Sequence, residues 1–207
     1  MHQALLSVDP TVSIAQEELS RLRRHNGPAF PWSVPDQDNR AFTGAAFWQY
    51  MNRHFINVFS SLVPEKTAQE AAVLVRPLLL DPGLYAVFPD AEEALQACLD
   101  RGAKNYILSN NYPELPFVLQ ALGLLKYFRG VVVSGAVGLD KPRPEIFRFA
   151  RQLAGSPERC LMVGDNPSAD IEGALRAGMT AVQVHNTAPS RADYRFETLL
   201  PVVDLVK

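Results

Sequence analysis

The sequence predicts an α/β protein: a doubly wound, Rossmann-like parallel sheet with an inserted helical cap domain. In the C-terminal part, short apolar runs alternate with segments of helical length, whereas residues 14–83 show helical patterns only. The expected strands are residues 105–108, 130–133, 160–163 and 180–184, and the expected helices are residues 91–101, 113–122, 144–153 and 169–177. Because these strands are apolar throughout, we expect burial on both faces and right-handed crossovers between them.

The N-terminal part begins with a short apolar run at residues 4–8 that ends at Asp9-Pro10-Thr11, so a buried strand and a turn are expected there. Helices are expected at residues 13–25, 45–62 and 64–80, and a proline-rich loop at residues 27–40. The sequence therefore predicts a core domain built from residues 1–13 and 84–207, and a helical cap domain of residues 14–83.

Composition narrows the class of protein. The chain has 207 residues, 47% of them hydrophobic, and 20 basic side chains nearly balance 22 acidic ones, which argues against a nucleic-acid partner. Its two cysteines, Cys98 and Cys160, belong to no CxxC pattern and are expected to be reduced. No signal-peptide pattern and no apolar run of roughly 20 residues is present, so no membrane association is expected. We predict a cytoplasmic monomer or homodimer.

Polar side chains follow the expected strands. In open α/β sheets, ligands bind outside the carboxyl ends of the strands. The residues at these positions are Ser7, Asp9, Ser109, Asn110, Lys141, Asp165 and Asp170. Carboxylates can hold Mg²⁺, lysine and hydroxyl groups can bind phosphate oxygens, and a carboxylate can act as nucleophile or as general acid and base. This set of side chains predicts a site for a small phosphorylated molecule and Mg²⁺.

Three stretches carry a family resemblance. Ser109-Asn110 after a strand, KPRPEIF at residues 141–147, and GDNPSADI at residues 164–171 resemble the second, third and fourth motifs of the haloacid dehalogenase-like superfamily. The helical segment after the first expected strand resembles the C1-type cap of its subfamily IA. The resemblance implies that Ser109 and Asn110 bind the phosphoryl group and that Lys141 neutralises nucleophile and phosphate. It also implies that Asp165 binds Mg²⁺ with the support of Asp170.

The first motif of that superfamily, DxDxT, is degenerate here. When the motif is aligned on Asp9 and Thr11, Asp9 is the acid/base and a metal ligand, and Ser7 occupies the place of the nucleophile. A serine cannot form the aspartyl-phosphate that the family uses. In a second alignment Asp9 itself is the nucleophile, but Pro10 then removes a backbone N–H that normally holds the phosphate. In a third interpretation the segment is only a strand and a turn.

Three functions follow from these alternatives. The first is a Mg²⁺-dependent phosphatase acting on a small phosphate monoester. The second is a pseudo-phosphatase that binds a phosphorylated ligand or a protein partner without hydrolysing it, as the serine at position 7 suggests. The third, a 2-haloacid dehalogenase, is less favoured, because Asp9, Asp165 and Asp170 suit phosphate and Mg²⁺ better than attack on carbon.

Overall fold

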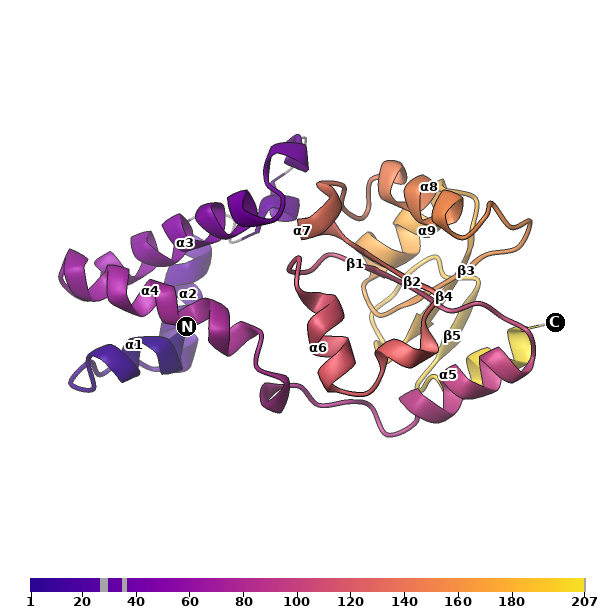
Figure 1. Ribbon diagram of the computed structural model, residues 1–207, viewed down its shortest axis with the longest axis horizontal. Coiled ribbons are helices and arrows are strands. Elements are labelled where there is room, and N and C mark those ends of the chain that lie inside the picture. The colour runs from indigo at the N-terminus through magenta and orange to yellow at the C-terminus, as the bar shows by residue number, and fades with distance from the viewer. Residues whose placement is uncertain (27–29, 35–36, 207) are drawn as a thin grey trace. The chain divides into compact units, whose positions relative to one another are not determined.

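The computed structural model describes residues 1–26, 30–34 and 37–206, and the chain divides into two compact units, Met1–Tyr85 and Ala86–Lys207 (Figure 1). Among the described residues, the first unit has helices and connecting turns, and the second contains every strand. We describe each unit by itself.

The N-terminal unit contains the α-helices α1 (His2–Val8), α2 (Gln16–His25), α3 (Ala45–Ser60) and α4 (Glu65–Leu79). Helix α3 packs along α4 and buries large side chains such as Phe47, Met51 and Phe59. The buried residues of α4 include three alanines, whose small side chains allow close packing of the helix. The expected helices of this region are confirmed. Of the expected loop, residues 27–29 and 35–36 lie outside the described residues, and short 3-10 turns occupy Pro31–Ser33 and Asn39–Ala41.

The strand expected at residues 4–8 is wrong, because this segment is part of helix α1. Ala4 and Leu5 are both fully buried, whereas Ser7 is exposed, which is the pattern of one helical face rather than the alternation of a strand. Helix α1 packs against α4 of the N-terminal unit. Residues 1–13 therefore belong to the helical unit, and the expected core domain loses its first segment.

The C-terminal unit holds two parallel sheets. Strands β1 (Tyr106–Ser109) and β2 (Gly130–Val133) form one, and β3 (Leu161–Gly164), β4 (Thr180–Val184) and β5 (Tyr194–Phe196) form the other in that order. The helices of this unit are α5 (Ala91–Asp100), α6 (Leu115–Ala121), α7 (Ser134–Val137), α8 (Pro144–Leu153) and α9 (Gly173–Arg176), with a π-helical turn at Pro167–Glu172 and a 3-10 helix at Leu200–Leu205. The expected strands and the α/β class are confirmed.

The strands of the C-terminal unit lie between two groups of helices, with α8 and α9 on one side and α5 and α6 on the other (Figure 1). On the α8 side, a single apolar cluster includes Val132 of the first sheet, Ile146 and Phe147 of α8, and Met162 and Ala181 of the second sheet. The two sheets therefore share one layer of core. No helix of the described residues is long and apolar enough to cross a bilayer.

Helix α3 carries a buried histidine, His54, whose Nε2 has no hydrogen-bond partner among the described residues. Burial lowers the pKa of this imidazole, and the charge of Arg23 lowers it further. The folded state therefore holds His54 neutral at a pH where the unfolded chain binds a proton.

We expect the melting temperature to fall as the pH is lowered from about 7.5 to about 5.5, because below a pH of about 6.5 the unfolded chain binds a proton that the folded chain excludes. In the His54→Leu variant this fall in melting temperature should be smaller. Thermal denaturation across this pH range measures it, with the exposed His25→Leu as the matched control. An equal pH response in wild type and His54→Leu would contradict the assignment.

Candidate functional site

A buried ion pair lies at the carboxyl ends of β1 and β3. The Lys141 ammonium donates to the carbonyl of Leu108 on β1 at 2.9 Å and to Asp170 Oδ1 at 2.5 Å, and the two side chains are only 10% and 5% exposed. Two buried opposite charges in hydrogen-bond contact are strongly coupled. This pair confirms that the Lys141 and Asp170 segments, which are far apart in sequence, meet at one edge of the strands.

Asn110 fixes the main chain of Lys141. Its Oδ1 accepts from the Lys141 N–H at 2.8 Å, and its Nδ2 donates to the Lys141 carbonyl at 2.9 Å. Both ends of the Asn110 amide are thus engaged within the protein. The sequence predicted a phosphate-binding role for this residue, which stays a prediction, and the structure shows that its side chain positions the lysine.

The turn after β3 holds Asp170 in place. Asp170 Oδ2 accepts from the Asn166 N–H at 2.9 Å, and Asn166 Oδ1 in turn accepts from the N–H groups of Ser168 and Ala169. Gly164 is required here, because a Cβ at this position would lie 2.3 Å from Asp170 Oδ2. Asn166 was not among the predicted site residues, although an asparagine just before a helical turn is a recognisable capping signal.

Asp165 and Ser109 leave their side chains free at the same edge. Asp165 is exposed, and its carbonyl is held by the Asn186 side chain at 2.6 Å, while its carboxylate makes no hydrogen bond or ion pair with the described residues. Ser109 follows Leu108 at the end of β1 and is half-buried. The structure therefore links Lys141 to Asp170 directly, and Ser109 and Asp165 follow Leu108 and Gly164 at the carboxyl ends of β1 and β3.

Ser7 and Asp9 belong to the N-terminal unit and follow no strand. The Ser7 hydroxyl donates to the Gln3 carbonyl at 2.9 Å within α1. Asp9 terminates that helix, and its Oδ1 accepts from the Thr11 N–H at 3.0 Å and from the Thr11 hydroxyl at 2.6 Å. The placement at a strand end, on which both catalytic assignments relied, is wrong, because α1 is a helix.

The carboxylates at this edge of the strands suit a cation that is also coordinated by a bound ligand. No group of three carboxylate, histidine or cysteine side chains with metal-binding geometry occurs among the described residues, and Asp9 belongs to a different unit from Asp165 and Asp170. Asp170 is already engaged by Lys141 and Asn166. Mg²⁺ is commonly held by one or two carboxylates together with substrate phosphate and water. Asp165 alone fits that mode of binding.

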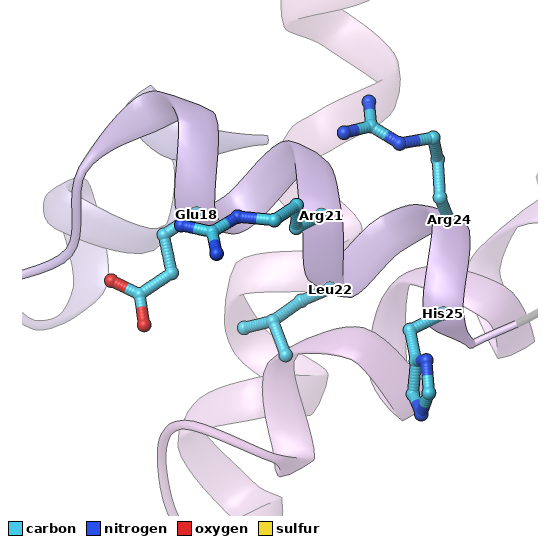
Figure 2. A pocket seen from close by; sticks show the side chains of 5 residues that line it. All are labelled: Glu18, Arg21, Leu22, Arg24 and His25. Atoms are coloured by element: carbon cyan, nitrogen blue, oxygen red, sulfur yellow. The ribbon is translucent and has the colours of Figure 1, made fainter.

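A surface hollow of about 460 Å³ lies elsewhere, on α2 (Figure 2). Figure 2 shows its lining side chains spreading out from one helix, without converging on a point. They are Glu18, Arg21, Leu22, Arg24 and His25. Glu18 lies in the first turn of α2 and Arg24 and His25 in the last, which is the charge order that the helix dipole favours. We assign these charges to helix stability.

The fold and the site define the class of protein: a parallel α/β domain with a lysine–carboxylate pair at the carboxyl ends of its strands. Residues 8–178 match the family of haloacid dehalogenase-like hydrolases, and the chain belongs to this family. It is 31% identical to haloacid dehalogenase-like hydrolase domain-containing protein 3 of Mus musculus over 96% of this chain and 81% of that protein.

Two further similarities bear on activity and fold. A phosphoserine phosphatase of Thermus thermophilus is 42% identical over 102 residues, which are 48% of this chain and 41% of that enzyme. The match thus spans less than half of that relative. The crystal structure of a HAD phosphatase from Thermococcus onnurineus superposes with a TM-score of 0.67 at 26% identity, over 98% of this chain and 86% of that one.

We expect Lys141→Met to lower the free energy of unfolding by about 3–5 kcal/mol, because it leaves the Asp170 carboxylate buried without its partner. The double variant Lys141→Met/Asp170→Leu should regain most of this loss. Chemical denaturation measures both. The exposed pair of Arg148 and Glu145 provides the control, since Arg148→Met should cost less than about 1 kcal/mol. An equal loss of unfolding free energy in Lys141→Met and Arg148→Met would contradict the strong coupling between Lys141 and Asp170.

Proposed function

We propose that the chain takes part in hydrolysing a small phosphate monoester, with Ser109 and Lys141 binding the phosphoryl oxygens. The observation that carries this proposal is the buried Lys141 ammonium, held beside Ser109 by Leu108 and Asp170. An ammonium group has three N–H donors, and these two contacts use two of them. The third is available to a ligand oxygen, as is the Ser109 hydroxyl.

Asp165 is the residue that we propose to hold a cation. A carboxylate beside a bound phosphate dianion is repulsive unless a cation lies between them. Mg²⁺ held by Asp165, substrate and water would supply that charge neutralisation. The names of related phosphatases support this choice of substrate class, although the phosphoserine phosphatase is matched over only part of its length.

The second candidate function is binding without hydrolysis. Among the described residues of the C-terminal unit, the carboxylates that the motifs supply are Asp165 and Asp170, and Asp170 is engaged in the ion pair. Helix α1 carries Ser7, which occupies the nucleophile's place in the first alignment of the degenerate motif. This arrangement favours a chain that binds phosphate. The attacking nucleophile would have to come from another segment of polypeptide. Attack on a 2-haloacid has no comparable support.

We expect Ser109→Ala and Asp165→Asn each to lower kcat/KM toward p-nitrophenyl phosphate in Mg²⁺ by about tenfold to a hundredfold, since each removes an interaction with a charged group. Ser60→Ala, exposed on α3, is the matched control and should leave the rate unchanged. If wild type shows no turnover yet binds inorganic phosphate by calorimetry, and Ser109→Ala weakens that binding, the second candidate function is supported. Absence of both turnover and binding contradicts both candidates.

Substitutions at residues 7 and 9 distinguish between the alternative alignments of the first motif. Because the Asp9 carboxylate holds the turn after α1 through Thr11, we expect Asp9→Asn to lower the melting temperature slightly and to leave any turnover within about twofold of wild type. Ser7→Asp should likewise produce no gain in turnover. Steady-state assays with p-nitrophenyl phosphate and Mg²⁺ test both variants. A loss of about a hundredfold or more in Asp9→Asn would restore its assignment as nucleophile or acid/base.

A further inference from the structure

The peptide group that follows the candidate cation residue is held from both sides. This peptide joins Asp165 to Asn166, and its carbonyl oxygen accepts from Asn186 Nδ2 at 2.6 Å. Its N–H donates to Asp170 Oδ2 at 2.9 Å. The peptide is trans, so its C=O and N–H point in opposite directions and its two partners lie on opposite sides. Together they prevent the peptide plane from rotating and thereby fix the backbone of Asp165.

The Asp165 carboxylate has no other support. It is exposed and makes no hydrogen bond or ion pair with the described residues, so its position follows from its backbone and its rotamer. Partners that orient a metal ligand without touching the metal commonly change the metal affinity by about tenfold to a hundredfold. Asn186 is therefore placed to affect cation binding without contacting the cation.

The loop after β4 that carries Asn186 is held by a buried amide, Gln183. This side chain is fully buried in β4. Its Nε2 donates to the carbonyls of Asn186 at 2.7 Å and Ala188 at 2.8 Å, and its Oε1 accepts from the Ser190 hydroxyl. Both donors of the amide are thus used on the loop. Because a buried polar group is costly to leave unpaired, Gln183 and the loop stabilise each other's conformation.

The chain enters this loop in a conformation that has to be held. His185 has a φ of 55°, in the left-handed region that residues with a side chain seldom adopt. Such a conformation persists where the surrounding contacts determine it. The Asn186 amide is engaged at both ends, since its Oδ1 accepts from the Ala188 N–H at 2.8 Å and its Nδ2 donates to Asp165. The loop therefore has one defined arrangement, in which Asn186 faces the Asp165 carbonyl.

We propose that Gln183 and Asn186 are positioning residues for a cation on Asp165. Gln183 holds the loop after β4, and Asn186 of that loop orients Asp165 through its main chain. This role rests on the proposed function, in which Asp165 holds Mg²⁺, and it adds β4 to the elements that support the site. The Lys141–Asp170 pair holds the same peptide from its other side. Loss of the Asn186 contact should weaken cation binding and leave cation-free phosphate binding nearly unchanged.

Binding of Mn²⁺ to the full chain in the presence of inorganic phosphate, followed by the EPR signal of free Mn²⁺, tests the proposal. Mn²⁺ favours the same oxygen ligands as Mg²⁺. We expect Asn186→Ala and Gln183→Met each to raise the Kd of Mn²⁺ about tenfold. Calorimetric binding of inorganic phosphate without a divalent cation should stay within about twofold of wild type. Ser190→Ala is the matched control and should bind Mn²⁺ like wild type, because Gln183 keeps both of its donor bonds.

A double-variant cycle shows whether Asn186 acts through Asp165. Asp165→Asn should raise the Kd of Mn²⁺ by at least about tenfold. In the Asp165→Asn background, Asn186→Ala should have no further effect, because the carboxylate that it orients is gone. Additive losses in the double variant would overturn the proposal. An equal loss of cation-free phosphate binding in Asn186→Ala would overturn it as well, because it would indicate general loosening of the strand ends.

The Asp165→Asn variant also separates the positioning role from the proposed function. Wild-type Mn²⁺ affinity in Asp165→Asn would contradict the assignment of the cation to Asp165, and the positioning role would fail with it. A loss in Asp165→Asn with unchanged affinity in folded Asn186→Ala would overturn the positioning role alone. Asn186 is only partly buried, so Asn186→Ala decides the outcome if Gln183→Met does not fold.

Discussion

The buried contact between Lys141 and Asp170 is the constraint on which the C-terminal unit depends. It neutralises two charges that burial would otherwise make costly, and it joins β1 to the turn after β3, which belong to different sheets. The Asn110 side chain accepts from the Lys141 N–H, and the Asn166 N–H donates to the Asp170 carboxylate. One interaction therefore links the geometry of the strand ends to the placement of Ser109 and Asp165.

The sequence was sufficient wherever local rules decided the structure. The GDNPSADI segment combines a glycine whose Cβ would clash with Asp170 and an asparagine that caps the following turn, so its conformation follows from nearby residues. The strands β1, β2 and β3 were expected at residues 105–108, 130–133 and 160–163 as apolar runs between helices, within one residue of their bounds in the structure. Strand β5 was not expected, because Tyr194–Phe196 is short, largely exposed and has an arginine at its centre.

The sequence was insufficient where tertiary contacts determined the local structure. The run at residues 4–8 is too short for periodicity to separate a strand from a buried helix, and its packing against α4 determines the helix. The motif alignment then carried that error into the site, since Ser7 and Asp9 received roles that require a strand end. Asn110 shows a second limit. Its position after β1 was predicted, but its partner is the Lys141 main chain, a contact between residues 31 positions apart.

The requirements of a bound cation and of a bound phosphoryl group meet at the same strand ends. A divalent cation beside Asp165 needs further oxygen ligands, and a phosphoryl group beside Lys141 needs an attacking group, yet the carboxylate of Asp170 is committed to the lysine. Both requirements arise at the carboxyl ends of β1 and β3. The Lys141–Asp170 contact fixes the groups on either side, so binding of a cation by Asp165 and of phosphoryl oxygens by Ser109 and Lys141 would both depend on this one contact.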